Sequence, residues 1–176
     1  MLRPVRRIVT GRDGDGRSIV ISDEISPHTK ADRLTDLWRT YTAPAGNEDD
    51  TDQAAAAVEL KPPPNGTVFR YFQIKPESEY QEQNVEQRQK EAVQLFEAMG
   101  AGAERDAGAK HQNMHKTDSV DYIILLSGEV TMLLDNGEVS MKPLDVVIQR
   151  GTNHAWVNYG LEPAVLAAIL IDATPI

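Results

Sequence analysis

Residues 114–128 read MHKTDSVDYIILLSG and are the most informative stretch of the chain for its fold. Its first half is polar, and its second half is an apolar run that ends at Gly128. His115, Thr117 and Asp121 share one face if the segment is a continuous β-strand, because successive side chains of a strand point to opposite sides. The stretch therefore predicts a strand that carries a row of polar side chains along one face.

Most of the chain after Met114 has the pattern of short β-strands. The segments VDYIILLSG, EVTMLLD, EVSMK, DVVIQ, NHAWVN and PAVLAAILIDA follow one another with short connections. Asp135-Asn136-Gly137 predicts a type I′ hairpin turn between two of them. Many short strands with turn signals between them indicate an antiparallel sandwich or barrel.

The first hundred residues contain fewer clear elements. We predict a hairpin within residues 6–22, a strand at TVFRYFQI, and a helix within residues 77–100 that ends at Gly100 and Gly102. Val85, Ala92, Phe96 and Met99 form the helical apolar pattern. The segment DRLTDLWRTYT is either a strand or a short helix, and residues 23–66 contain no motif with a recognisable function. The helix is either a lid over the barrel mouth or a segment packed on an outer face or a dimer interface.

Composition limits the classes of function. The chain has 176 residues with a net charge of −9, which disfavours a nucleic acid or an anionic membrane surface as a partner. It has no cysteine, which excludes disulfides and thiolate metal sites and fits a reducing compartment. No apolar run is long enough for a membrane helix. We therefore expect a cytoplasmic protein of one domain.

The second informative stretch is DVVIQRGTNHAWVN, at residues 145–158. His154, Trp156 and Asn158 share one strand face by the same alternation. His115, His154 and Asp121 would form a set of two histidines and one carboxylate if their strands converge. Such a set leaves coordination positions open and suits Fe²⁺, with Zn²⁺, Ni²⁺ or Mn²⁺ as alternatives.

The two stretches resemble the two motifs of the cupin family. The first cupin motif has two histidines separated by one residue, then an acid after three or four residues, and a glycine after six more. His115, Thr117, Asp121 and Gly128 stand at those positions here. The second motif has a histidine and, after three intervening residues, an asparagine, which are His154 and Asn158 in this chain. The resemblance covers roughly residues 114–172 and is to small single-domain cupins that are often labelled oxidoreductases.

The resemblance implies an all-β jelly-roll barrel over residues 1–176. Residues 1–75 would form an N-terminal strand arm and the first barrel strands, residues 76–112 a helical insertion and loop, and residues 113–174 the barrel core. Cupins commonly dimerise through edge strands, so we expect a homodimer. The activity implied is that of a metal-dependent oxidoreductase or dioxygenase on a small organic molecule, with His115, Asp121 and His154 as catalytic and metal-binding residues.

Thr117 departs from the family pattern, because a neutral hydroxyl replaces a strong nitrogen ligand. We expect Thr117 to orient a ligand or water, and His111 is a possible replacement donor. Metal affinity would then be lower than in a full-set cupin. A metal-free protein that binds a small molecule without turnover is the alternative, as is a decarboxylase, isomerase or cyclase that uses the same residues.

The remaining predicted ligand contacts would line the barrel interior. They favour an apolar or aromatic ligand, with Arg150 either clamping a carboxylate or lying in a solvated turn. These residues are Trp156, Asn158, Arg150, Phe69 and Tyr71.

Overall fold

Strands dominate the part of the chain that the computed structural model describes, which is residues 4–30, 33–48 and 51–175. In these ranges there is one α-helix, α1 (Val85–Ala98), with two short 3-10 helices, η1 (Gln53–Ala55) and η2 (Glu77–Tyr80). The strands are β1 (Arg6–Arg12), β2 (Ser18–Ile25), β3 (Thr29–Lys30), β4 (Leu34–Thr40), β5 (Thr67–Ile74), β6 (Ser119–Ser127), β7 (Val130–Leu134), β8 (Glu138–Met141), β9 (Val146–Arg150), β10 (His154–Val157) and β11 (Ala164–Asp172).

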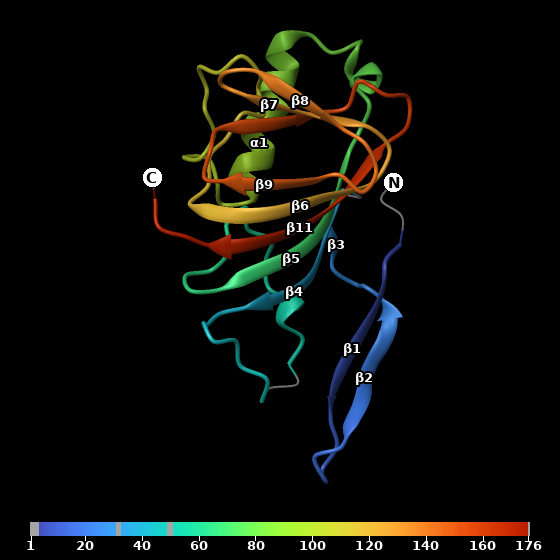
Figure 1. Ribbon diagram of the computed structural model, residues 1–176. Helices are drawn as coiled ribbons and strands as arrows, with labels where there is room; N and C mark the ends of the chain where they lie inside the picture. The colour runs from blue at the N-terminus through green and yellow to red at the C-terminus, as the bar shows by residue number, and fades with distance from the viewer. Residues whose placement is uncertain (1–3, 31–32, 49–50, 176) are drawn as a thin grey trace.

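Two antiparallel sheets form the body of the molecule (Figure 1). The large sheet has the strand order β3-β4-β5-β11-β6-β9, and the small sheet has the order β10-β7-β8. The crossing connections between the sheets are those of a jelly roll, so the predicted all-β barrel with one inserted helix is confirmed. No helix in the described ranges has the length and apolar character of a membrane span.

The apolar core lies between the two sheets. Alternation along β6 turns Ile123 and Leu125 inward, where they meet side chains from both sheets. The buried members of this core are Val68, Ile123, Leu125, Val130, Met132, Met141, Trp156, Ala164, Leu166, Ala168 and Leu170. The burial of these side chains is the main favourable term that holds the sheets together.

Gly128 ends β6 for a steric reason. Its φ is +80°, and a Cβ atom at this position would lie 2.7 Å from the Cα atom of Ala164. Any other residue would therefore be strained and would push β11 away. The glycine that follows the polar motif is thus a requirement of the turn from β6 into β7.

Several predicted elements differ in detail from the structure. The segment left open between strand and helix is strand β4, and the predicted helix begins only at Val85, after a capping box made by Asn84 and Gln87. Val85 is exposed instead of lying on the buried face of the helix. The turn at residues 135–137 is not type I′, because Gly137 has a positive φ and Asn136 does not.

A cluster of three charged side chains is buried on the inner face of the large sheet. Arg39 and Arg70 both bind Asp36, with Nη2 of Arg39 at 2.5 Å from Oδ2 and Nε of Arg70 at 3.0 Å from Oδ1. Arg70 also donates to the backbone oxygen of Glu59 at 2.7 Å. All three side chains are at least 96% buried, so their charges are stabilised by one another instead of by water.

We expect Asp36→Ala to destabilise the fold by about 3–5 kcal/mol, because it leaves two buried guanidinium groups without their counter-ion. Urea unfolding measures this loss. Asp23→Ala is the matched control, since it removes an exposed carboxylate from Arg6 and should lower the unfolding midpoint far less than Asp36→Ala does. Equal effects of the two substitutions would contradict a structural role for the buried cluster.

Candidate active site

Two backbone hydrogen bonds join the segment before β6 to the start of β10. The N–H of His115 donates to the oxygen of His154 at 3.0 Å, and the N–H of His154 donates to the oxygen of His115 at 2.9 Å. Residues that are opposite one another in an antiparallel pair project to the same side. The two imidazole rings therefore lie together, with centroids 4.4 Å apart.

Each ring is oriented by a second hydrogen bond to the backbone. Nδ1 of His115 lies 2.9 Å from the oxygen of Asn113, and Nδ1 of His154 lies 3.0 Å from the oxygen of Thr152. A carbonyl oxygen only accepts, so each Nδ1 must carry the proton. In the neutral rings Nε2 is then the unprotonated nitrogen, which is the form in which histidine binds a metal or accepts a proton.

Both rings are held in the neutral state. Burial lowers the pKa of His115, and a hydrogen bond to Asn113 offsets part of this effect. Burial, together with the neighbouring His115, lowers the pKa of His154 to about 3. The His154 side chain is only 3% exposed, so water cannot stabilise its charged form. The pair therefore presents two nitrogen lone pairs at neutral pH.

Aromatic side chains flank the two histidines. The ring of Phe96, from α1, lies 5.1 Å from His115, and the ring of Trp156 lies 5.8 Å from His154. Trp156 also belongs to the core between the sheets. The helix thus contributes an apolar contact to the site, which places it beside the histidine pair.

A second polar group lies further along the same segment. Oγ1 of Thr117 is 2.8 Å from Oγ of Ser119, and Ser119 in turn donates a hydrogen bond to the carboxylate of Asp121. Oδ1 of Asp121 is buried without a hydrogen-bond partner, which is unusual for a carboxylate oxygen.

The environment of Asp121 favours its protonated form. Burial raises its pKa to about 6, and the hydrogen bond from Ser119 and the positive charge of Arg70 offset part of this rise. The carboxyl group is 5% exposed. A buried carboxyl group with a pKa near neutrality is the kind of group that transfers protons in enzymes.

The structure does not assemble the predicted set of three metal ligands. Among the described residues, no group of three or more His, Asp or Glu side chains could hold a metal ion. Asp121 pairs with Gln149 and Leu170 in the large sheet, whereas His115 pairs with His154. The two histidine nitrogens fit a divalent ion as a two-ligand site, in which most coordination positions are left to water or substrate.

His111 does not replace the missing nitrogen. Its Nδ1 accepts a hydrogen bond from the N–H of Asn113 at 3.2 Å, so its lone pair is already used. Burial lowers its pKa, with Glu77 and Arg88 as the charged neighbours. The ring therefore faces a different set of side chains from those around His115 and His154.

Two other predicted site residues have structural roles. Asn158 donates to the oxygens of Ile74 and Glu162 at 3.0 and 2.8 Å and accepts from the N–H of Gly160 at 2.8 Å. Its amide hydrogens are fully used, so it ties β10 to the end of β5. Arg150 is exposed and points away from the interior, because its neighbour Gln149 is the buried residue of β9.

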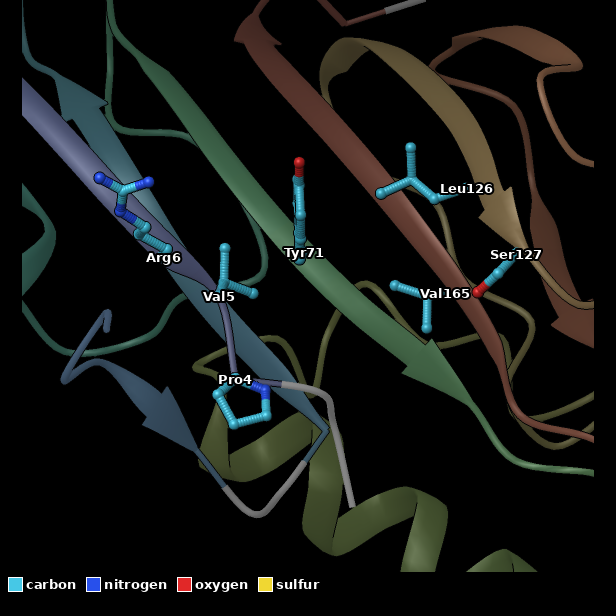
Figure 2. Close-up of a pocket in the computed structure, with 7 residues that line it drawn as sticks. All are labelled: Pro4, Val5, Arg6, Tyr71, Leu126, Ser127 and Val165. Atoms are coloured by element: carbon cyan, nitrogen blue, oxygen red, sulfur yellow. The ribbon is translucent and has the colours of Figure 1, made fainter. Parts of the chain in front are cut away.

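Phe69 and Tyr71 were predicted to line the interior and lie on the outer face of the large sheet instead. They alternate with Val68, Arg70 and Phe72, which face the core side. Figure 2 shows Tyr71 facing the N-terminal segment of the chain. Alternation predicts that such residues share a face, but it does not decide which face is inside.

Sequence reasoning missed Ser119, Arg70 and Phe96 as parts of the site. Ser119 has the same parity as Thr117 and Asp121, so this residue was open to prediction. Arg70 carries no signal of burial in the sequence, because a charged residue within a strand normally faces the solvent. Phe96 was recognised as an apolar helix residue, but nothing in the sequence placed the helix against His115.

The sequence of the chain was compared with family models and with known proteins. No protein-family model matches the chain. The chain is 25% identical to the cupin-domain-containing oxidoreductase fogC of Aspergillus ruber, over 99% of this chain and 76% of that protein. It is 28% identical to phomopsin biosynthesis cluster protein C′ of Diaporthe leptostromiformis, over 89% and 72% of the two chains. A shorter match, 39% identical, covers 36% of this chain and 34% of the cupin-domain-containing oxidoreductase virC of Hypocrea virens.

Solved structures with a similar arrangement are also cupins, at low similarity. A cupin 2 domain-containing protein from Halorhodospira halophila has a TM-score of 0.40 and 17% identity, over 94% of this chain and 75% of that one. A cupin 2 conserved barrel domain protein from Salinispora arenicola has a TM-score of 0.36 and 14% identity. The matched region covers 61% of this chain and 64% of that protein's length.

We expect Asp121→Asn to change how stability depends on pH. The raised pKa of Asp121 means that the folded protein holds this proton more tightly than the unfolded chain, so wild type loses stability as pH rises from about 4 to 6. Asparagine does not titrate. The unfolding free energy of the variant minus that of wild type should therefore increase by about 2 kcal/mol between pH 4 and pH 8.

Urea unfolding at several pH values, with a chelator present, measures this difference. Asp23→Asn is the control, because Arg6 lowers the pKa of Asp23 and the difference should change in the opposite direction. A difference for Asp121→Asn that stays constant or decreases with pH would show that Asp121 is stabilised as a carboxylate in the fold.

Proposed function

We propose that this chain is a cupin enzyme of the oxidoreductase type that acts on a small organic molecule at the His115–His154 pair. The observation that supports a reactive site most directly is the pair of fixed, neutral imidazoles. Both have Nδ1 bound to a backbone oxygen, and both have Nε2 free of a partner among the described hydrogen bonds.

We propose one divalent metal ion as the cofactor, held by Nε2 of His115 and Nε2 of His154. Fe²⁺ is the favoured ion, and Zn²⁺, Ni²⁺ and Mn²⁺ suit the same nitrogen donors. A bound ion of this kind supplies Lewis acidity or, for iron, reactivity with oxygen. The hydrogen bonds from Nδ1 to Asn113 and Thr152 orient both rings and raise the basicity of Nε2.

Asp121 is the proposed proton-transfer residue. Its pKa of about 6 lets it exchange a proton near neutral pH, and its unpartnered Oδ1 is free to meet a substrate group. A hydrogen bond with Ser119 lowers this pKa, and Ser119 in turn lies 2.8 Å from Oγ1 of Thr117. Arg70, buried with Asp36, limits the rise in this pKa by its positive charge.

The proposed substrate is apolar or aromatic. Trp156 and Phe96 flank the histidines and would contact a flat or hydrophobic molecule. Names of relatives that refer to biosynthesis clusters support a small organic molecule as the substrate. Decarboxylase, isomerase or cyclase chemistry would use the same imidazoles and the same carboxyl group.

Binding without turnover is the second candidate function. The separation of Asp121 from the histidine pair favours it, because only two protein ligands then remain for an ion. In that case both Nε2 atoms would accept hydrogen bonds from a ligand, and Thr117 and Asp121 would be further polar residues of the binding site.

A measurement of metal binding distinguishes the metal-dependent enzyme from the metal-free binding protein. Untagged protein is dialysed without oxygen against Fe²⁺ or Zn²⁺, and bound metal is measured by mass spectrometry. We expect wild type to bind near one equivalent, and His115→Ala and His154→Ala to lose at least roughly tenfold in affinity. His111→Ala is the matched control and should bind as wild type does, because its ring lies outside the pair.

Asp121→Asn tests the two-ligand site itself and should keep the metal. If Asp121→Asn lost metal to the same extent as the two histidine variants, Asp121 would be a third metal ligand beside His115 and His154. No binding by wild type, or binding that neither histidine substitution weakens, would contradict the metal-dependent enzyme and leave the metal-free binding protein.

A further inference from the structure

Four aromatic rings form a continuous row through the site. The ring of Phe96, from α1, lies 5.1 Å from that of His115, and the two imidazoles lie 4.4 Å apart. The His154 ring lies 5.8 Å from that of Trp156. The end of the row at Trp156 is fixed, because this side chain belongs to the core between the sheets. The other end of the row is a side chain of the helix.

Phe96 closes its end of the row. It is 3% exposed, although most residues of the helix that carries it are in contact with solvent. His154 is likewise 3% exposed, since its ring lies between those of His115 and Trp156. A small organic molecule therefore reaches His154 only if part of the site moves.

Few apolar side chains hold the helix against the body of the protein. Of its 14 residues, only Ala92 and Phe96 are buried. Val85, Val93 and Leu95 are 75%, 38% and 36% exposed. A segment with little buried apolar surface opens locally at a lower free-energy cost than that of global unfolding. The helix is thus a part of the site that is suited to move.

The two ends of α1 are anchored. At the N-terminal end, Arg88 donates to the carboxylate of Glu77 at 2.8 Å, and the N–H of Glu77 donates to the oxygen of Asn158 at 2.8 Å. At the C-terminal end, the oxygen of Met99 accepts a hydrogen bond from the N–H of Leu60 at 3.1 Å. These bonds keep the helix beside the site whether or not its middle turns pack on the histidines.

The stretch between the anchors is held less firmly. Among the described residues, no side-chain hydrogen bond joins α1 to a strand of either sheet. Gln89 accepts a hydrogen bond from Arg105, which forms an isolated bridge with His115. The chain leaves the helix through Gly100, whose φ is +63° and where a Cβ atom would meet no described atom within 4 Å. A glycine in open space allows the change of backbone angles that a hinge needs.

We propose that α1 is a movable cover of the active site, with Phe96 as the residue that closes the His115–His154 pair. In the open state the helix moves away from the barrel between its anchored ends, so that Ala92 and Phe96 leave the site together. The space beside His115 then receives an apolar or aromatic group of the ligand in place of the Phe96 ring. Closure of such a cover excludes water from the reacting groups. The proposal rests on the proposed function of the histidine pair.

Thiol labelling measures the opening, because the chain has no cysteine of its own. Ala92→Cys places a thiol on the buried face of α1. Ala168→Cys is the matched control, because Ala168 is 1% exposed and lies on β11 in the core. The rate of reaction with iodoacetamide is divided, for each variant, by the rate of the same variant unfolded in urea.

We expect the Ala92→Cys thiol to react at least roughly 100-fold faster than the control thiol. Low concentrations of urea should leave its rate nearly unchanged, since a local opening exposes little surface. Equal rates for the two thiols, with the same dependence on urea, would show that the helix opens only when the whole protein unfolds. That result would overturn the cover.

Carbethoxylation by diethyl pyrocarbonate, mapped by mass spectrometry of peptides, measures access to the two imidazoles. The reaction needs an unprotonated ring nitrogen, which a neutral histidine offers. We expect Phe96→Ala to raise the rate at His115 and His154 at least roughly tenfold, because the closing ring is removed. Val93→Ala is the matched control on the same helix and should react as wild type does, since Val93 is 38% exposed.

A second variant keeps the closing ring in place. Gln89→Ala removes the hydrogen bond to Arg105 and should also raise the rate at the histidines, and far-UV circular dichroism verifies that each variant is folded. Unchanged rates in Phe96→Ala and Gln89→Ala would overturn the role of Phe96 as the closing residue. Neither experiment uses a metal or a substrate, so failure of the cover and failure of the metal site are separate results.

Discussion

The site depends on the pair of backbone hydrogen bonds between His115 and His154. They join the segment that precedes β6 of the large sheet to the first residue of β10 in the small sheet. Because the two residues are directly opposite, their imidazoles must lie side by side, whatever the other side chains do. The bonds from Nδ1 to Asn113 and Thr152 then decide the tautomer. Position and protonation state are thus both set by backbone atoms.

The polar end of the barrel imposes a second constraint. Asp36, Arg39 and Arg70 are buried with a formal charge of one negative and two positive groups. An ionised Asp121 would balance that excess, and burial opposes its ionisation. The carboxyl group is therefore poised between its two states, and a ligand that carries or accepts charge would shift the balance. The protonation state of Asp121 would therefore respond to the charge of a bound ligand, although Asp121 is not part of the histidine pair.

Much of the fold could be predicted from the alternation of apolar and polar residues. The strands after Ser119, the first hairpin and the polar face of β6 follow from that pattern. It failed between His115 and Asp121, because the chain bends at Asp118 and β6 begins only at Ser119. The segment changes neighbours at the bend, so residues of the same parity no longer share one site. Period-two reasoning assumes a straight strand and cannot detect such a change.

The same limit explains the errors at Phe69 and Tyr71 and the choice that was left open at Arg150. Their faces depend on which side of the sheet packs against the second sheet, and this is a property of the whole barrel. Arg70 and Asp36 do not reveal the inner face in the sequence, since buried ion pairs are uncommon and a charged residue in a strand normally indicates the solvent side. Only the three-dimensional pairing of these charges shows that the polar side of β5 faces inward.

The central claim is that His115 and His154 are neutral, with the proton on Nδ1 and a free lone pair on Nε2. Nitrogen-detected NMR of the histidine side chains in metal-free protein, with His115→Gln and His154→Gln for assignment, measures this directly. The account predicts Nδ1–H tautomers for both rings at pH 7, and for His154 no protonation down to about pH 5. An imidazolium or an Nε2–H tautomer in either ring at pH 7 would contradict it.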